Sequence, residues 1–313
     1  MAGLQRVAIV GAGTVGTAIA YASIIKGVAD EVTLYDQNGA KAIAEVLDLR
    51  HGLQFVPPAR VDGGDDFAVC ADADVVVVTA GAKQHPGQSR MELAQANAQL
   101  ARDLVPRLVD VAPDAVLLFV TNPVDVITFV AQECCDLPHG RVIGSGTVLD
   151  TSRLRQLIAA RLGVAVSSVH GHVVGEHGDS EIALWSSATV GGVHITEVSG
   201  PEGQSVGVHE LDELLHQVRT AAYRIIEGKG ATNLAIGLST ARILTAIGAD
   251  ERAVLPVTAR HSVDGVGDVA YSLPAVVGRA GVLTTLDVPL DDAERDGLTA
   301  SAAAIRRVID DVS

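Results

Sequence analysis

The segment GAGTVG, residues 11–16, constrains the fold of this chain more than any other feature. It follows the short apolar run 6–10 and opens a helix-like stretch, and a second apolar run, 31–35, comes next. A strand, a glycine-rich turn, a helix and a second strand in this order predict a βαβ unit.

Each glycine of this segment has its own role in binding a dinucleotide. Gly11 permits the tight turn, Gly13 lets the backbone approach a pyrophosphate, and Gly16 lets helix and strand pack closely. The phosphates would lie at the helix N-terminus, beside Val15. Asp36 ends the second strand, where its carboxylate can bind the adenosine ribose hydroxyls and repel a 2'-phosphate. The sequence therefore predicts NAD rather than NADP, with a ligand-free glycine loop as the alternative.

Two further apolar runs, 74–79 and 115–121, are typical of strands buried on both faces of a parallel sheet. Ligands of such sheets collect at the carboxyl ends of the strands. We therefore expect two strand-end segments to face the cofactor: Thr79-Ala80-Gly81-Ala82 and Thr121-Asn122-Pro123.

Composition excludes several classes of protein. The chain has 313 residues, of which 48% are hydrophobic and 19% charged, as expected for a well-packed protein of about two domains. Its net charge of -15 argues against nucleic acid as a partner. The uncharged run 7–25 could be a signal peptide or membrane span, but its glycines and the strand that follows favour a buried strand and helix. Three cysteines without a CxxC pair favour a reducing, cytoplasmic location.

The pentapeptide GEHGD, residues 175–179, places one histidine between glycines. His177 can hold or release a proton near neutral pH, and the glycines give a substrate access to the ring. A surface turn is the alternative reading.

Upstream, Asp150 and Arg153 are three residues apart and share a helix face, whereas Arg155 points to another side. An intrahelical ion pair would also explain Asp150 and Arg153.

The polar segment 83–90 precedes a helical pattern over 91–111, which Pro106 is expected to kink. We interpret this segment as a mobile loop over the site, which would give Gln84 and Arg90 a function. An ordinary surface connection is the alternative.

The second half of the chain predicts strands and helices in alternation. Strands are expected at 182–190 and 193–198, followed by a helix over 208–227 whose apolar stripe runs from Leu211 to Ile226. A second helix is expected to end at 247, and it is followed by antiparallel strands at 252–263 and 268–277 and by a terminal helix from 290. The predicted fold class is α/β: a Rossmann-type doubly wound parallel sheet in residues 1–145, followed by an α+β substrate-binding and catalytic domain in 146–313.

In order along the chain, these motifs resemble those of the L-lactate dehydrogenases in the lactate/malate dehydrogenase family. The resemblance covers essentially the whole chain and is carried by GAGTVG, Asp36, AGAKQHPGQSR (80–90), TNPVD (121–125), GSGTVLDTSRLR (144–155), GEHGDS (175–180) and GKGATN (228–233). It implies hydride transfer between NADH and a 2-keto acid, as in fermentation at the end of glycolysis.

The resemblance gives each matching residue a role. His177 resembles the general acid that protonates the substrate carbonyl, and Asp150 its carboxylate partner. Arg153 resembles the anchor that binds the substrate carboxylate bidentately. Arg90 would be carried in by the loop and polarise the carbonyl.

The remaining pocket residues bear on specificity. Asn122 is expected to contact the carbonyl side of the substrate and the cofactor, and Thr232 to line the pocket. Malate dehydrogenases of the family carry arginine where this chain has Gln84, so pyruvate is the expected substrate. Gln88-Ser89 departs from the usual Glu-Thr. A malate or broader 2-hydroxy acid dehydrogenase is the alternative.

Arg155 and His170 match the positions through which allosteric bacterial members bind fructose 1,6-bisphosphate. We hypothesise that these residues of paired subunits bind one phosphate across a two-fold axis of a homotetramer. Because a histidine binds phosphate well only when protonated, activation is expected to weaken as the pH rises.

Other readings are weaker. His170, His172, Glu176 and His177 could bind zinc, but no HExxH or cysteine set supports a metal, and none is expected. An NAD-dependent glycosidase would share this fold, but nothing in the chain matches the substrate domain of those enzymes. A non-enzymatic NAD-binding regulatory protein would lack some catalytic partner, but all the expected catalytic partners are present.

Overall fold

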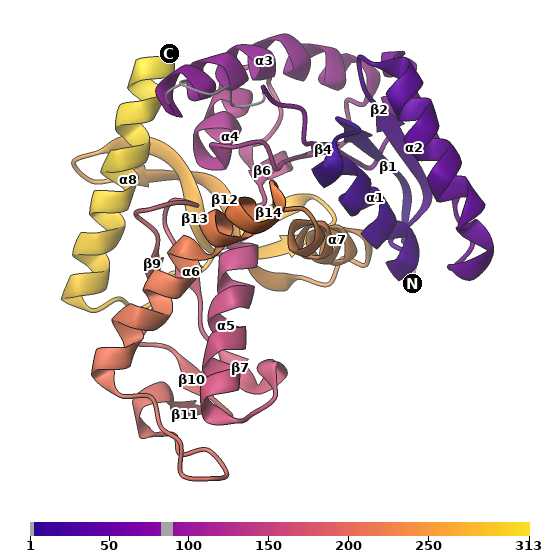
Figure 1. The fold of residues 1–313 in the computed structure, drawn as a ribbon. Helices are drawn as coiled ribbons and strands as arrows, with labels where there is room; N and C mark the ends of the chain where they lie inside the picture. The colour runs from indigo at the N-terminus through magenta and orange to yellow at the C-terminus, as the bar shows by residue number, and fades with distance from the viewer. Residues whose placement is uncertain (1–2, 83–89) are drawn as a thin grey trace.

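The computed structural model of the protein describes residues 3–82 and 90–313, and it has one large mixed sheet at its centre (Figure 1). The strand order is β14-β13-β12-β6-β5-β4-β1-β2-β3. The six strands of the first half are mutually parallel, and their order places the change of winding direction between β1 and β4. These strands are β1 (Leu4–Val10), β2 (Ala29–Tyr35), β3 (Arg60–Gly64), β4 (Val75–Val78), β5 (Val116–Phe119) and β6 (Val142–Gly144).

Helices cover both faces of this sheet, and the strand β4 shows why its sequence is apolar throughout. Val76 and Val78 belong to one apolar cluster, which the helices α3, α4 and α8 complete. Val75 and Val77 belong to the other, which α1, α2 and α7 complete. The helices of the first half are α1 (Thr14–Lys26), α2 (Gly39–His51), α3 (Arg90–Val111) and α4 (Val124–Glu133). The predicted Rossmann-type parallel sheet is confirmed.

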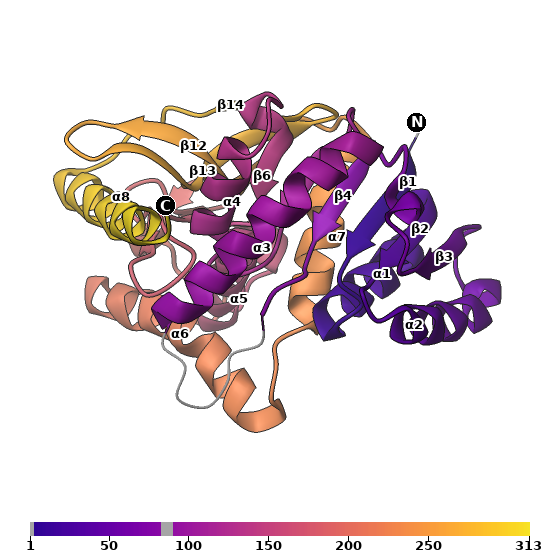
Figure 2. The same ribbon diagram turned by 90° about the horizontal axis from the view of Figure 1, so that it is seen from above.

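The second half adds antiparallel strands to the sheet and a separate helical layer (Figure 2). β12 pairs antiparallel with β6, and α5 and α6 share a third apolar cluster with β7 and β8. The elements are α5 (Val148–Leu162), β7 (Val169–His170), β8 (Val173–Val174), β9 (Ile182–Ala183), β10 (Thr189–Val190), β11 (Val193–His194), α6 (Val208–Lys229), α7 (Leu234–Gly248), β12 (Ala253–Val263), β13 (Gly267–Gly278), β14 (Gly281–Thr285) and α8 (Asp292–Val312).

One expectation for the second half is wrong. The long strands expected at 182–190 and 193–198 are the short strands β9, β10 and β11, followed by a 3-10 turn. Gly191 and Gly192 both have positive φ, so the chain reverses there between β10 and β11. The apolar stripe of α6 is buried only in its first half, and Ile226 near its end is 48% exposed.

In the part of the chain that the structure describes, no helix is long and apolar enough to cross a membrane. The run 7–25 is the strand β1 and the helix α1, as expected.

Candidate active site

The glycine segment forms a turn into which side chains would not fit. Gly11 has a φ of 108°, and a Cβ on Gly16 would lie 1.9 Å from the Gly11 carbonyl oxygen. The Thr79 hydroxyl donates to that same oxygen over 2.9 Å, which joins the first and fourth strand ends. A Cβ on Gly13, by contrast, would meet no described atom within 4 Å. The surface at Gly13 is therefore open to a ligand.

The start of α1 and the end of β2 meet at this turn. Among the described residues, no side chain caps the N-terminus of α1, so the first-turn N–H groups, including that of Val15, can bind an anion. The Asp36 carboxylate accepts from the Ala12 backbone N–H over 2.9 Å and from the Asn38 N–H over 3.0 Å. These contacts hold the carboxylate beside the open turn, where the ribose of a dinucleotide would lie.

The other two strand ends are joined by a residue that the sequence analysis did not single out. Asn97, which is buried in α3, accepts from the Ala82 N–H and donates to the Asn122 carbonyl oxygen, each over 2.7 Å. The Thr121 hydroxyl donates to the Ala80 carbonyl oxygen over 2.7 Å. The strand-end segments that contain Thr79, Ala80, Gly81 and Asn122 therefore lie together at one edge of the sheet, as expected.

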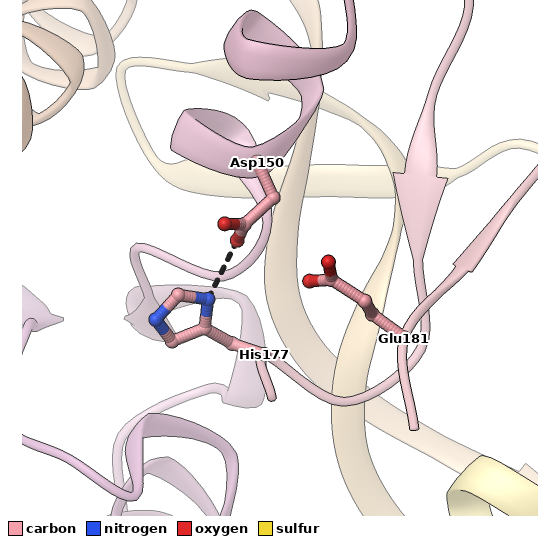
Figure 3. Close-up of side chains that lie close together, drawn as sticks. All are labelled: Asp150, His177 and Glu181. Atoms are coloured by element: carbon pink, nitrogen blue, oxygen red, sulfur yellow. Dashed lines mark hydrogen bonds and ion pairs between the residues drawn. The ribbon is translucent and has the colours of Figure 1, made fainter. Parts of the chain in front are cut away.

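His177, Asp150 and Arg153 form a continuous hydrogen-bonded chain. The Asp150 carboxylate lies 2.6 Å from Nδ1 of His177 and accepts from Nη1 of Arg153 over 2.5 Å (Figure 3 shows the first contact). Asp150 and Arg153 share one face of α5, as their spacing predicts. Only 3% of the Asp150 side chain is exposed, against 27% for His177, so the outer edge of the ring is open to a substrate.

The charge of Asp150 controls the protonation of His177. Burial alone would lower the pKa of the imidazole, but the Asp150 charge and hydrogen bond raise it to about 9. Burial alone would likewise raise the pKa of Asp150, but His177 and Arg153 lower it. Near neutral pH the pair is therefore an imidazolium and a carboxylate.

A second buried carboxyl, which the sequence analysis did not assign, holds the backbone of His177. Asp125 accepts from the His177 N–H over 2.7 Å and from the Thr258 hydroxyl over 2.6 Å. Burial raises the pKa of Asp125 to about 6, although these two hydrogen bonds oppose the shift. Its only sequence signal was an acidic residue within the apolar stretch that follows TNPV.

A third carboxyl, that of Glu181, was also not singled out from the sequence. One ligand atom each of Asp150, His177 and Glu181 lies within 4.8 Å of the other two (Figure 3). Within the described ranges this is the one such group with metal-ligand types, and Arg153 already binds its Asp150 carboxylate. The set considered for zinc from the sequence, which includes His170 and His172, is not such a group.

Arg155 points away from this site, as expected. Its Nε donates to the Gly171 carbonyl oxygen over 2.9 Å, and its Nη2 lies 3.3 Å from Nε2 of His172. Burial, helped by the charges of Arg155 and His170, lowers the pKa of His172 to about 4. His170 is exposed on β7.

The remaining expected site residues are placed in part. Asn122 is exposed, whereas Thr232 is half-buried and lies in the segment before α7. Arg90 is the first residue of α3, and Gln84 lies outside the described residues, as do Gln88 and Ser89.

An open glycine turn with an acceptor for ribose, together with an imidazolium that can donate a proton, defines an NAD-dependent oxidoreductase. The chain belongs to the lactate/malate dehydrogenase family. The NAD binding domain of this family matches residues 5–144, and its alpha/beta C-terminal domain matches residues 147–313.

Similar proteins carry consistent names. The chain is 46% identical to an L-lactate dehydrogenase of Bifidobacterium animalis subsp. lactis, over 96% of this chain and 95% of that protein. It is 47% identical to an L-lactate dehydrogenase of a Synechococcus strain, over 97% and 98%. Among solved structures, a lactate dehydrogenase from a Medee basin deep-sea metagenome library has a TM-score of 0.93 and 38% identity, with 100% of this chain and 99% of that chain covered. The minor L-lactate dehydrogenase of Enterococcus mundtii has a TM-score of 0.92 and 40% identity, over 98% of each chain.

Proposed function

We propose that the protein is an L-lactate dehydrogenase, which interconverts pyruvate and L-lactate. The observation that carries this proposal is the hydrogen-bonded chain from His177 through Asp150 to Arg153, in a protein whose glycine turn is open to NAD. When bound, the nicotinamide supplies or accepts the hydride.

His177 is the proton donor in this mechanism. Its Nδ1 faces Asp150, so its Nε2 is the nitrogen that can reach a substrate. The imidazolium donates this proton to the carbonyl oxygen of pyruvate, and the neutral ring takes it back when lactate is oxidised. Asp150 fixes the orientation of the ring and stabilises its charged form.

Arg153 is the substrate anchor. A guanidinium has five N–H donors, so the contact with Asp150 leaves others for a substrate carboxylate. A bidentate contact would fix the direction of the carbonyl group. The proposal further assigns Arg90 to polarising the carbonyl, Asn122 to contacting it and Thr232 to lining the pocket.

Gln84 carries the choice of pyruvate over oxaloacetate. A neutral amide leaves the second carboxylate of oxaloacetate without a charged partner, and this disfavours its binding. The alternative function is that of a malate or broader 2-hydroxy acid dehydrogenase, in which this preference would be reversed or lost.

Consumption of NADH with pyruvate, oxaloacetate and a longer 2-keto acid tests the proposal. We expect a strong preference for pyruvate, and we expect Gln84→Arg to move the preference toward oxaloacetate. Lys83→Arg, which adds no charge in the same segment, is the matched control. Preference of the unmodified protein for oxaloacetate would refute the assignment of Gln84, and turnover of none of the three acids would favour a binding role.

We further propose that the enzyme is a cytoplasmic homotetramer with a division at residues 145 and 146, activated by fructose 1,6-bisphosphate. Arg155 and His170 would bind a phosphate of this effector. The turned-away guanidinium of Arg155 and the exposed position of His170 support this assignment.

The effector proposal is tested by the pyruvate concentration that gives half-maximal rate, measured with and without the bisphosphate. We expect the effector to lower this concentration in the unmodified protein and to have no effect in Arg155→Gln. Arg161→Gln removes an exposed arginine from the same helix and should retain the response. An unchanged half-saturation in the unmodified protein would refute the effector site.

A further inference from the structure

The Glu181 carboxyl is a buried acid that the mechanism has not used. Figure 3 shows it pointing toward Asp150 and His177, and the three groups lie within 4.8 Å of one another. Glu181 is only 2% exposed, and its Oε1 has no hydrogen-bond partner among the described residues. Because an ionised carboxylate here would be a buried charge without a donor, its neutral form is favoured.

The charged groups around Glu181 come from two helices and one loop. Asp150 and Arg153 lie on α5, His177 lies in the loop before β9, and Arg219 lies on α6. The Arg219 guanidinium donates to the Glu181 backbone carbonyl, over 3.1 Å from Nε. Burial and the negative charge of Asp150 raise the pKa of Glu181 to about 9, while His177, Arg219 and Arg153 oppose the shift.

Two other carboxyl groups lie near His177. Asp125 faces the backbone of His177 from α4, and its pKa of about 6 means that it is ionised above neutral pH. Glu176 accepts from the Ser180 hydroxyl. Of Asp125 and Glu181, Glu181 is therefore the carboxyl that still holds a proton when the pH rises above neutral.

We propose that Glu181 is a positioning residue that acts through His177: it is neutral near neutral pH and loses its proton before His177 does as the pH rises. The proton goes to water, and the new carboxylate lies next to the imidazolium. This inference rests on the proposed function, because it matters for catalysis only if His177 is the proton donor.

The order of proton loss follows from the charges. If His177 lost its proton first, the Asp150 carboxylate would lose one of its two cationic neighbours and keep only Arg153. If Glu181 loses its proton first, the imidazolium gains a second carboxylate neighbour. An opposite charge at such a distance favours the charged form by about 1–3 pKa units, so the second order prevails. Glu181 thereby keeps the proton donor charged at higher pH.

A titration of the His177 ring by NMR in the protein without NADH tests the inference independently of turnover. The substitution His177→Asn identifies the signal by its loss. We expect Glu181→Gln to lower the apparent pKa of His177 by about one unit. Glu213→Gln, which removes a carboxylate from the solvent side of α6, should leave it unchanged. An unchanged His177 titration in Glu181→Gln would overturn the proposal.

A second readout separates this inference from the proposed function. In Glu181→Gln, the decline of the pyruvate reduction rate at alkaline pH should move to lower pH, with kcat near neutral pH retained. Glu181→Asp keeps a carboxyl and should show a smaller shift. If the unmodified protein does not reduce pyruvate, the proposed function fails, whereas the NMR titration still decides the role of Glu181. If Glu181→Gln does not fold, infrared spectra of the unmodified protein test the proposal instead. A protonated carboxyl band that persists above neutral pH supports the proposal, and the absence of such a band overturns it.

Discussion

Replacing Asp150 by asparagine tests the proton-donor role of His177 most directly. The substitution preserves the size of the side chain but removes the negative charge that lies 2.6 Å from Nδ1 of His177. That charge overcomes the effect of burial and raises the pKa of His177 from 6.5 to about 9. A shift of this size corresponds to about 3 kcal/mol in favour of the imidazolium.

Without this charge, burial lowers the pKa of His177 toward its ordinary value, and only the smaller effects of the Asp125 and Glu181 charges oppose it. At that ordinary value, roughly a quarter of the variant would carry the proton at about pH 7, against nearly all of the unmodified enzyme. The rate of pyruvate reduction by the variant should fall about tenfold for each pH unit above neutral, whereas the rate of the unmodified enzyme should stay constant up to about pH 9. The loss of a fixed ring orientation lowers the rate further than the loss of the proton alone, so we expect kcat/KM at neutral pH to fall by about 10²-fold or more.

The assay is kcat/KM for pyruvate across the neutral and alkaline range, for the unmodified enzyme, Asp150→Asn and Asp212→Asn. Asp212 is exposed on α6, so its substitution removes the same charge far from the ring. A profile for Asp150→Asn that runs parallel to that of the unmodified enzyme would show that Asp150 does not set the protonation of His177. The mechanism above would then need another proton donor.

Three further substitutions follow from the contacts described. Gly16→Ala places a Cβ 1.9 Å from the Gly11 carbonyl oxygen, so we expect it to lower the unfolding free energy by about 1–3 kcal/mol and to weaken NAD binding. Gly13→Ala, where the added Cβ meets nothing within 4 Å, should leave stability nearly unchanged, and equal thermal stability of the two variants would contradict the steric argument. Asp36→Ala removes the proposed ribose acceptor, and the ratio of kcat/KM for NADH to that for NADPH should fall; an unchanged ratio would show that another group selects NAD. Thr258→Val removes a donor to the buried Asp125 carboxylate and should cost about 1.5–3 kcal/mol in urea unfolding, while a loss near zero would mean that Asp125 finds another donor.

The sequence predicted the parts of the site that depend on local spacing. The glycine turn and the shared helix face of Asp150 and Arg153 follow from positions a few residues apart, and the strand ends follow from the apolar run before each of them. The approach of His177 to Asp150 was expected only through the resemblance to known dehydrogenases, because 27 residues separate them.

The groups that sequence analysis missed depend on partners far apart in the chain. Asp125 and Thr258 are 133 residues apart, and the fold alone makes them a buried pair. Asn97 joins strand ends that lie on either side of it in sequence. Glu181 follows a recognisable motif, but only its burial beside Asp150 makes it chemically unusual. An isolated polar residue in an apolar stretch was the one available signal.

The irregular region after Glu181 was mispredicted for a different reason. Its β-branched residues favour strands, but the contacts made by Ser186 interrupt the pairing. Both the backbone N–H and the hydroxyl of Ser186 donate to the Glu294 carboxylate on α8, over 2.9 and 2.6 Å. A distant helix thus determines where the local strand ends.

The pairing of β12 with β6 means that the two halves of the chain do not constitute two folding units. Buried residues of α7, such as Leu244, complete the same apolar cluster as Ile19 of α1, so the first half alone would expose that surface to water. The two family domains, which match residues 5–144 and 147–313, therefore share one sheet and one apolar cluster. Heating should melt both halves in one calorimetric transition, and a hinge motion between them is opposed by the continuous hydrogen-bonded sheet.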